Sequence, residues 1–339
     1  MENFFAEVAY VHKLNANELG FRGGQPHGAG RFFLVAKSCI GYFPPLSEVV
    51  LNDHVLLGVI PPFTNEIVLT KYVYHNSKYA TLDKDEDRDE YRIYLNSAND
   101  PERAYYKPEE IVVFIKIVPP DSPESITYKL LCYESTDRGY SRIHSLLRLT
   151  DPKNGTHALI SIKELTFLDE LRKISFGKKI IPKEIIEEAF QEPIQHAPVS
   201  EEDRYAATRV IRSRSFRDLI LYFYEDRCAI TNKEMVIEHN EFKNLEAAHI
   251  LARAAGGGNH PSNGLALERN LHWAFDKGFF TLTKDLRVDV HPNAQKIPYL
   301  SSKHGSKIFL PQDSRSRPNQ DSILWHRKNV FGMFMHGDI

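Results

Sequence analysis

The sequence is poor in cysteine, and its three cysteines, Cys39, Cys132 and Cys228, stand far apart. None of them belongs to a CxxC pair. A disulfide framework needs several paired cysteines and a zinc ribbon needs CxxC pairs, so neither is indicated. Any metal ion bound by this chain must use other ligands.

Long apolar runs and a strong net charge are also missing. Charged residues interrupt every apolar stretch well before the ~18 residues of a transmembrane helix. The first ten residues carry Glu2 and Glu7 and lack the basic region of a signal peptide. We therefore expect a cytoplasmic protein with no membrane partner. The formal net charge of -2 does not indicate nucleic-acid binding, so any DNA-binding surface must be a local patch.

What the sequence does contain predicts a folded α+β protein of two domains. Its 339 residues exceed the usual size of one core, and 42% hydrophobic with 26% charged residues is typical of a folded chain. Residues 1–118 are rich in strand-like segments, 200–339 begin with a long helical segment at 201–227, and 119–199 form a mixed connecting region. The predicted strands of the first domain are 31–37, 66–75, 91–96 and 110–118, and the predicted helices of the connecting region are 169–174 and 182–192, before a linker at 192–203.

One stretch of the second domain concentrates polar residues that a core rarely uses, because buried polar groups need partners. It reads as a strand at 244–251, a loop at 253–263, a strand at 264–268 and a helix at 269–278. His272 and Asp276, four positions apart, project from one face of that helix. An imidazole with a carboxylate can bind magnesium, manganese or zinc. Taken alone, the pair is equally well explained as a surface histidine beside a solvated aspartate.

The second domain resembles the HNH nucleases in the order of four residues, which are His249, Asn263, His272 and Asp276. The ββα-metal unit of that family places a histidine on the first strand, an asparagine in the hairpin and metal ligands on the helix. The separations of 14 positions from His249 to Asn263 and 9 from Asn263 to His272 are close to the spacing of the family. The segments "RCAIT", "LHWAFDKGFFTL" and "HRKNVF" resemble its restriction-associated branch. The resemblance covers about residues 203–332.

The resemblance implies a role for each of the four residues. His249 would be the general base that activates water, and Asn263 would orient that histidine and shape the hairpin. His272 and Asp276 would hold a divalent metal, with Mg²⁺ expected and Mn²⁺ or Zn²⁺ as alternatives. The chemistry is consistent, because an imidazole with a pKa near ~6.5 accepts protons at neutral pH and a cation stabilises charge on the scissile phosphate.

The expected metal shell is short at Ala248, where the family often has an aspartate or histidine ligand. We expect Glu246, two positions earlier, to replace that ligand only if the hairpin is bent, and otherwise water to fill the position. His260 in the glycine-rich loop is a weaker candidate, whose alternative is an exposed loop residue.

The first domain also shows a resemblance. Its segments "KLNANELGFRGGQPHGAG", "YVYHNSKY" and "DRDEYRIYLN" resemble the effector domain of EcoRII-type restriction endonucleases, a DNA-binding pseudobarrel shared with a class of plant transcription factors. The match runs over about residues 8–118. In that family two arms grip duplex DNA, and they correspond here to residues 15–31 and 88–92.

The two arms supply the candidate DNA-binding residues. In the second arm, Arg88 and Arg92 can each donate two hydrogen bonds to guanine, and Glu90 can accept one from cytosine. Taken alone, the charge run at 82–90 is more simply a solvated loop. The first arm is a glycine-rich loop able to approach a groove, and its polar candidates are Asn15, Asn17, Arg22, Gln25 and His27.

Together the two resemblances imply a sequence-specific restriction endonuclease that cleaves both strands of double-stranded DNA by a metal-dependent HNH mechanism. Two alternatives stay open. One is a modification-dependent endonuclease that reads a methylated base; the other is a DNA-binding regulator whose nuclease unit has decayed, for which Ala248 is the only support. Because one chain has one site and a duplex has two scissile bonds of opposite polarity, we expect a homodimer, with sequential nicking by a monomer as the alternative.

Overall fold

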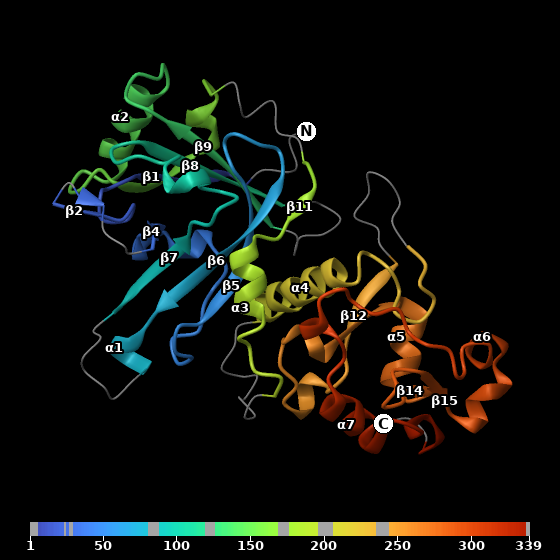
Figure 1. Ribbon diagram of the computed structural model, residues 1–339. Coiled ribbons are helices and arrows are strands. Elements are labelled where there is room, and N and C mark those ends of the chain that lie inside the picture. Colours follow the sequence, from blue (N-terminus) through green and yellow to red (C-terminus); the bar gives the residue numbers. More distant parts are fainter. Residues whose placement is uncertain are drawn as a thin grey trace. The chain divides into compact units, whose positions relative to one another are not determined.

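The computed structural model describes residues 6–23, 25–26, 30–80, 88–118, 126–168, 176–195, 206–234 and 244–336. The chain divides into two compact units (Figure 1). The first comprises Met1–Ile185 with Glu201–Arg212, and the second comprises Ile186–Ser200 with Ser213–Ile339. In the part of the chain that is described, no helix has the length and apolar character needed to cross a membrane.

A sheet of nine strands forms the first unit, in the order β10-β1-β8-β9-β5-β6-β7-β4, with β11 added beside β6. Its neighbours are antiparallel except for the parallel pairs β5 with β9 and β6 with β11. The strands are β1 (Val8–Lys13), β4 (Phe32–Val35), β5 (His54–Ile60), β6 (Ile67–His75), β7 (Glu90–Tyr94), β8 (Ile111–Ile117), β9 (Thr127–Tyr133), β10 (His157–Ser161) and β11 (Lys179–Ile180).

The four strands predicted in the first domain are confirmed as β4, β6, β7 and β8. The sheet does not end at residue 118, however, because β9, β10 and β11 come from the segment expected to connect the domains. The sheet curls into a nearly closed barrel. The hydroxyl of Tyr10 on β1 donates to the carbonyl of Leu34 on β4, 3.0 Å away, and so joins strands near opposite ends of the order.

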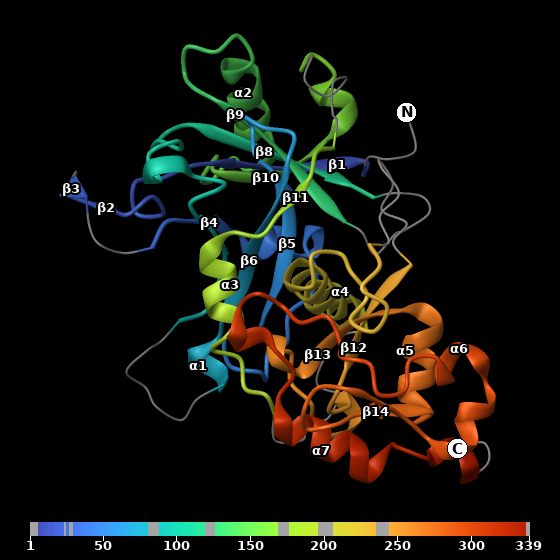
Figure 2. The same cartoon turned by 45° about the vertical axis from the view of Figure 1, so that its right-hand side comes forward.

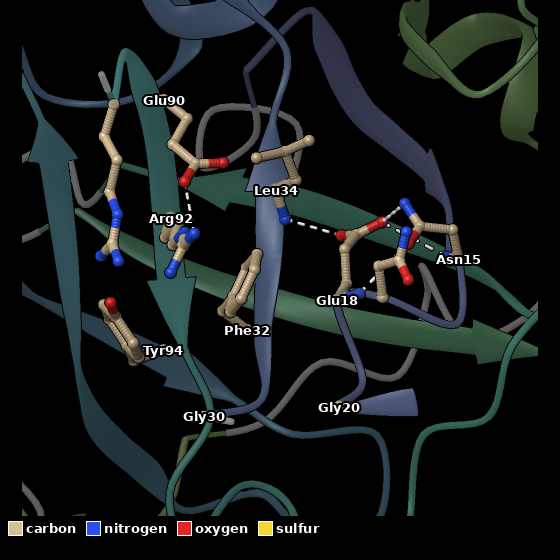
Figure 3. A pocket seen from close by; sticks show the side chains of 11 residues that line it. Asn15, Glu18, Gly20, Gly30, Phe32, Leu34, Glu90, Arg92 and Tyr94 are labelled. Atoms are coloured by element: carbon tan, nitrogen blue, oxygen red, sulfur yellow. Dashed lines mark hydrogen bonds and ion pairs between the residues drawn. The ribbon is translucent and has the colours of Figure 1, made fainter. Parts of the chain in front are cut away.

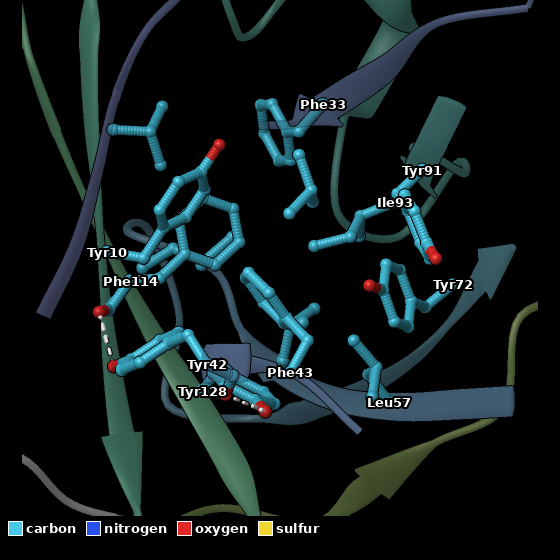
Figure 4. Packing of buried hydrophobic residues seen from close by; sticks show 14 of the residues in the cluster. Tyr10, Phe33, Tyr42, Phe43, Leu57, Tyr72, Tyr91, Ile93, Phe114 and Tyr128 are labelled. Carbon is cyan, nitrogen blue, oxygen red and sulfur yellow. Dashed lines mark hydrogen bonds between the residues drawn. The ribbon is translucent and has the colours of Figure 1, made fainter. Parts of the chain in front are cut away.

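Aromatic rings fill the inside of this curled sheet (Figure 4). The rings of Tyr10 and Phe43 meet edge to face at 5.3 Å, and those of Phe33 and Phe114 at 5.5 Å. Inward-facing positions alternate along β4, where Phe33 and Val35 are buried and their neighbours are half-buried. The large rings explain how one curved sheet encloses a core without a second layer on that face.

Four α-helices, α1 to α4, precede β12 in the described residues. Helix α2 (Tyr140–Thr150) packs Ile143 and Leu147 into a second core cluster with β8 and β10. Helix α1 (Ser77–Ala80) is short. Helix α3 (Lys183–Ala189) confirms the helix predicted at 182–192, whereas the helix predicted at 169–174 lies outside the described residues. Helix α4 (Ala206–Phe223) lies within the predicted helix at 201–227.

The second unit is built around a small hairpin and the helix that follows it (Figure 2). Its elements are β12 (Leu245–His249), β13 (Gly264–Glu268), α5 (Arg269–Asp276), β14 (Phe280–Leu282), β15 (Val288–Val290), α6 (Pro298–Ser301) and α7 (Gln320–Asn329). The strand–loop–strand–helix prediction for 244–278 is confirmed. Strands β14 and β15 form a further antiparallel hairpin.

Candidate active site and DNA-facing groove

The candidate active site is the β12–β13 hairpin with α5 packed on it. The strands pair antiparallel, with His249 opposite Gly264. Helix α5 starts directly after β13, and it buries one face formed by Leu271, Ala274 and Phe275. This arrangement leaves His272 and Asp276 beside β12 rather than in the core.

The loop of the hairpin is closed by Asn263, whose side chain is fully buried. Its Oδ1 accepts a hydrogen bond from the Leu251 amide at 2.8 Å, and its Nδ2 donates to the carbonyls of Leu251 at 3.1 Å and Gly258 at 3.0 Å. Gly257 cannot carry a side chain, because a Cβ would lie 1.9 Å from the carbonyl oxygen of Leu251. The glycine run and Asn263 therefore serve one purpose, which is to fold the loop tightly against β12.

His249 is held by a partner that the sequence did not reveal. Its Nε2 lies 3.1 Å from Oδ1 of Asn259, and its ring stacks on the ring of Phe216 at 3.9 Å. With the Nε2 proton donated to Asn259, Nδ1 keeps the lone pair that a base needs. Burial lowers the pKa of His249 from 6.5 to about 4. The imidazole is therefore neutral at pH 7.

His272 lies between two carboxylates. Its Nδ1 is 2.7 Å from Oε2 of Glu246, and its Nε2 is 3.3 Å from Oδ2 of Asp276. Burial alone lowers the pKa of His272, but the hydrogen bonds and charges of Asp276 and Glu246 outweigh it and raise that pKa above its ordinary value. Glu246 also accepts from Nε of Arg269 at 2.9 Å, which fixes the carboxylate in place.

The Nε2 atom of His272 and the Oδ2 atom of Asp276 have the spacing of two ligands of one cation. Neighbouring ligands of an octahedral ion, at about 2.1 Å from it, lie about 3.0 Å apart, and the observed separation is 3.3 Å. Glu246 accepts a hydrogen bond from Nδ1 and so directs Nε2 toward Asp276, in the way that carboxylates behind metal-binding histidines orient the ligand nitrogen. Within the described ranges no cluster of three His, Cys, Asp or Glu is suited to a metal ion. Two protein ligands suit magnesium, which keeps several waters.

The expectation that Glu246 needs a bent hairpin is wrong. The pairing is regular, with Glu246 opposite Leu267 and Ala248 opposite Leu265. Residues two apart in a strand share a face, so Glu246 lies on the same side as Ala248 without any bend. Ala248 is fully buried and offers no ligand. The carboxylate of Glu246 instead forms a hydrogen bond with Nδ1 of His272.

His260 has a local structural task. Its Nδ1 accepts hydrogen bonds from the Ser262 amide at 3.1 Å and the Ser262 hydroxyl at 2.8 Å. These bonds cap the single turn formed by Pro261–Asn263. The half-buried side chain is thus engaged in holding the loop, so His260 is not the exposed loop residue of the alternative.

A groove of about 610 Å³ in the first unit brings the two predicted arms together (Figure 3). Asn15 and Asn17 line it from the first arm, and Arg88, Glu90 and Arg92 line it from the second. Gly20 and Gly30 also border it, so the backbone is open to close approach there. The lining combines two arginines, Arg88 and Arg92, with two glutamates, Glu18 and Glu90, and so offers both hydrogen-bond donors and acceptors to a nucleic-acid edge.

Of the remaining candidates of the first arm, only Gln25 has a described side chain, and it does not line this groove. Gln25 is exposed on the short strand β3 (Gln25–Pro26), which pairs with β2 (Phe21–Arg22). The backbone of Arg22 belongs to β2, but its side chain lies outside the described residues, as does all of His27. The position of the first arm beside the groove therefore rests on Asn15 and Asn17.

Asn15 itself shapes the arm. Its Oδ1 accepts from the Glu18 amide at 3.1 Å, and its Nδ2 donates to Oε1 of Glu18. Glu18 is buried. Its other carboxylate oxygen accepts hydrogen bonds from the Leu34 amide at 2.7 Å and from Nε2 of His12 at 2.6 Å. Glu18 thus fastens the first arm to β1 and β4, and the Asn15 amide is engaged in the turn.

Arg92 is held in one orientation in the groove. Its guanidinium carbon lies 4.0 Å from the centroid of the Phe32 ring, and Nη2 forms an ion pair with Glu90. A stacked guanidinium presents a rigid fork of donors. Phe32 pairs with Tyr94 across β4 and β7, and this pairing makes Phe32 the diagonal neighbour of Arg92.

Comparison with known proteins finds a family match within the second unit. Residues 228–283 match the family model described as HNH endonuclease, and this range contains the whole hairpin and α5. No curated protein matches the chain. Five chains of solved structures match it, among them the "Modification dependent TagI restriction endonuclease", at 16% identity and a TM-score of 0.26 over 77% of this chain. The chain spans 62% of the length of that protein, and at this TM-score the likeness carries no argument. The family match indicates an HNH endonuclease domain at residues 228–283.

Proposed function

We propose that the chain is a cytoplasmic restriction endonuclease that reads duplex DNA with its first unit and cleaves both strands with its HNH domain. The observation that carries the proposal is the joint placement of a neutral His249 and the His272–Asp276 pair on one ββα unit. The EcoRII-type identity of the first unit is part of the proposal, and the convergence of both arms on one groove supports it.

His249 is the general base of this proposal. Its Nε2–H is engaged by Asn259, so Nδ1 is left to take the proton of a water molecule. The pKa of about 4 keeps the ring neutral but makes it a weak base, and a phosphate brought beside it would raise that pKa. Asn259 assumes the orienting role that the sequence suggested for Asn263, while Asn263 holds the loop.

His272 and Asp276 are the residues that would hold a divalent cation, with Glu246 orienting His272 through Nδ1. When bound, such an ion stabilises charge on the scissile phosphate and on the leaving oxygen. The nitrogen and oxygen donor set is compatible with Mg²⁺, and also with Mn²⁺ or Zn²⁺. The ligands lie one turn apart on α5, where Asp276 is exposed enough for a phosphate to approach.

Sequence reading is assigned to the groove of the first unit. Arg92, stacked on Phe32, and Arg88 are the donors for guanine, and Glu90 is the acceptor for the cytosine amino group. Asn17 borders the same groove and can reach a base edge or a phosphate. Asn15 contributes by holding the arm in shape.

The proposal is tested with the full chain and its His249→Ala variant on supercoiled plasmid DNA carrying random inserts. We expect Mg²⁺-dependent cleavage by the parent and none by the variant, because only the base is removed. Both proteins should retain the same subset of duplexes in a binding selection, since the reading groove is intact. Sequencing the cleaved ends gives the recognition site.

The controls separate the alternatives. Plasmid prepared with and without base methylation shows whether cleavage depends on modification. If the parent cleaves neither form with Mg²⁺, Mn²⁺ or Zn²⁺ but still selects duplexes, the chain is a DNA-binding regulator. Loss of both binding and cleavage in a folded His249→Ala variant would contradict the division of labour between the two units.

A further inference from the structure

Helix α4 contacts the candidate active site at His249. The Phe216 ring lies parallel to the His249 ring, with centroids 3.9 Å apart and an interplanar angle of 16°. Phe216 is almost completely buried, with 2% of its surface exposed. A buried ring in face contact leaves the imidazole little freedom to tilt, because tilting would open a void on one side.

The contact between Phe216 and His249 depends on the residue that stands opposite His249 in the hairpin. Gly264 stands opposite His249. A Cβ at Gly264 would lie 2.3 Å from Cδ1 of Ile220 and 2.8 Å from Cζ of Phe216. The glycine is therefore required for α4 to approach the hairpin closely enough for Phe216 to reach the imidazole.

A second contact fixes the other end of the same strand. Arg217, the next residue on α4, donates through Nε at 3.2 Å and Nη2 at 2.9 Å to the carbonyl of Leu245. Leu245 begins β12 and His249 ends it. Phe216 and Arg217, adjacent on α4, thus contact the two ends of β12, the strand that carries His249.

We propose that Phe216 is a positioning residue of the nuclease, which holds the His249 ring in the plane required to accept the proton of the attacking water. This inference rests on the proposed role of His249 as the base. Phe216 does not touch the reacting atoms; it acts by restricting the ring while Asn259 engages Nε2. Neither the HNH pattern nor the family match assigns a task to α4, which lies before residue 228.

The same packing sets the proton affinity of the base. Burial is the largest cause of the lowered pKa of His249, ahead of the opposing hydrogen bond from Asn259. The charged groups around the ring are Arg253 and His272, which lower the pKa, and Asp276, which raises it. Removing the aromatic cover admits water to one face of the ring, so the pKa should rise toward 6.5.

The experiment compares Phe216→Leu with Phe223→Leu in the full chain. Phe223→Leu is the matched control, because Phe223 is also buried on α4 but packs against Phe190 and Tyr222. The histidine titration is followed by ¹⁵N NMR without DNA, and single-turnover cleavage is followed from pH 4 to 8. Thermal melting verifies that each variant is folded.

For Phe216→Leu we expect the His249 titration to move up by at least one pH unit, the acid limb of cleavage to move with it, and the rate at pH 8 to fall about 10- to 100-fold. Phe223→Leu keeps the parent values. An unchanged titration and rate in folded Phe216→Leu overturns the inference. A shifted titration with unchanged cleavage also overturns it, and in that case the base assignment of His249 fails as well.

Discussion

The Nδ1 atom of His272 lies 2.7 Å from Oε2 of Glu246, across the face that β12 presents to α5. The contact joins a strand residue to a helix residue 26 positions later. It fixes the tautomer of the imidazole and directs Nε2 toward Asp276. Glu246 therefore takes part in the site without being one of the two proposed ligands.

Replacing Glu246 by glutamine should weaken binding of Mg²⁺ or Mn²⁺ by about 10- to 100-fold. The glutamine amide orients His272 less strongly than the carboxylate does, and the substitution removes a negative charge beside His272. Calorimetric titration of the full chain with either ion measures the change. Glu234→Gln is the control, since Glu234 pairs with Arg227 at the surface. Equal affinities for parent and Glu246→Gln would show that the carboxylate does not support the ion.

Replacing Arg92 by lysine should reduce affinity for the selected duplex by about 1 to 3 kcal/mol and leave affinity for random DNA nearly unchanged. Lysine keeps the charge but loses the rigid fork that stacks on Phe32. Binding isotherms on both duplexes measure the difference. The control is Arg142→Lys, since Arg142 also stacks on a ring, that of Phe167 at 4.1 Å, but does not line the groove. Equal losses on both duplexes would mean that Arg92 contacts phosphate.

The stability of the second unit should fall as the pH falls from 6.5 to 4. His326 on α7 is buried and neutral, with Nε2 donating to the Phe275 carbonyl at 3.1 Å and Nδ1 accepting from the Thr281 hydroxyl at 2.9 Å. Burial lowers its pKa from 6.5 to about 4. In that window the unfolded chain binds the proton and the folded chain does not, so protonation favours unfolding.

The full effect of His326 is on the order of 3 kcal/mol, at about 1.4 kcal/mol per pH unit. Urea unfolding at pH 7 and pH 5 measures it. His326→Gln should remove about half of the pH dependence, because burial lowers the pKa of His249 to about 4 as well, whereas His304→Gln, at an exposed histidine, should leave it unchanged. A parent protein equally stable at both values would contradict the assignment.

On a supercoiled plasmid with one recognition site, linear product should appear without prior accumulation of nicked circles. A two-fold dimer presents two sites related like the two strands, so both bonds are cut in one encounter. The time course is read together with the mass of the protein on DNA. Near-complete conversion to nicked circles first, at a mass of one chain per duplex, would establish sequential nicking by a monomer.

The sequence predicted the individual strands and helices well, because each depends on the pattern of residues that are adjacent in the chain. The alternation of apolar residues predicted β4, β6, β7 and β8, and the order of polar residues from His249 to Asp276 predicted the hairpin and its helix. The contacts that complete the site come from tertiary packing. Phe216 contacts His249, which lies 33 positions later in the chain. Strand and helix periodicities do not predict a contact between residues so far apart in sequence. The extent of the first sheet was missed partly for the same reason, since β10 and β11 join it beside β1 and β6, which come far earlier in the chain.

Helix α5 has eight residues, and no side chain caps its first turn. A helix this short has little stability of its own, so packing must maintain it. A cation bound by His272 and Asp276 would tie one turn to the next, and any ligand that binds only the folded form stabilises that form by mass action. The supply of divalent ions would then govern how long the cleavage domain survives heat or proteolysis as well as whether it cuts, so that depleting the ions would shorten the lifetime of the enzyme itself.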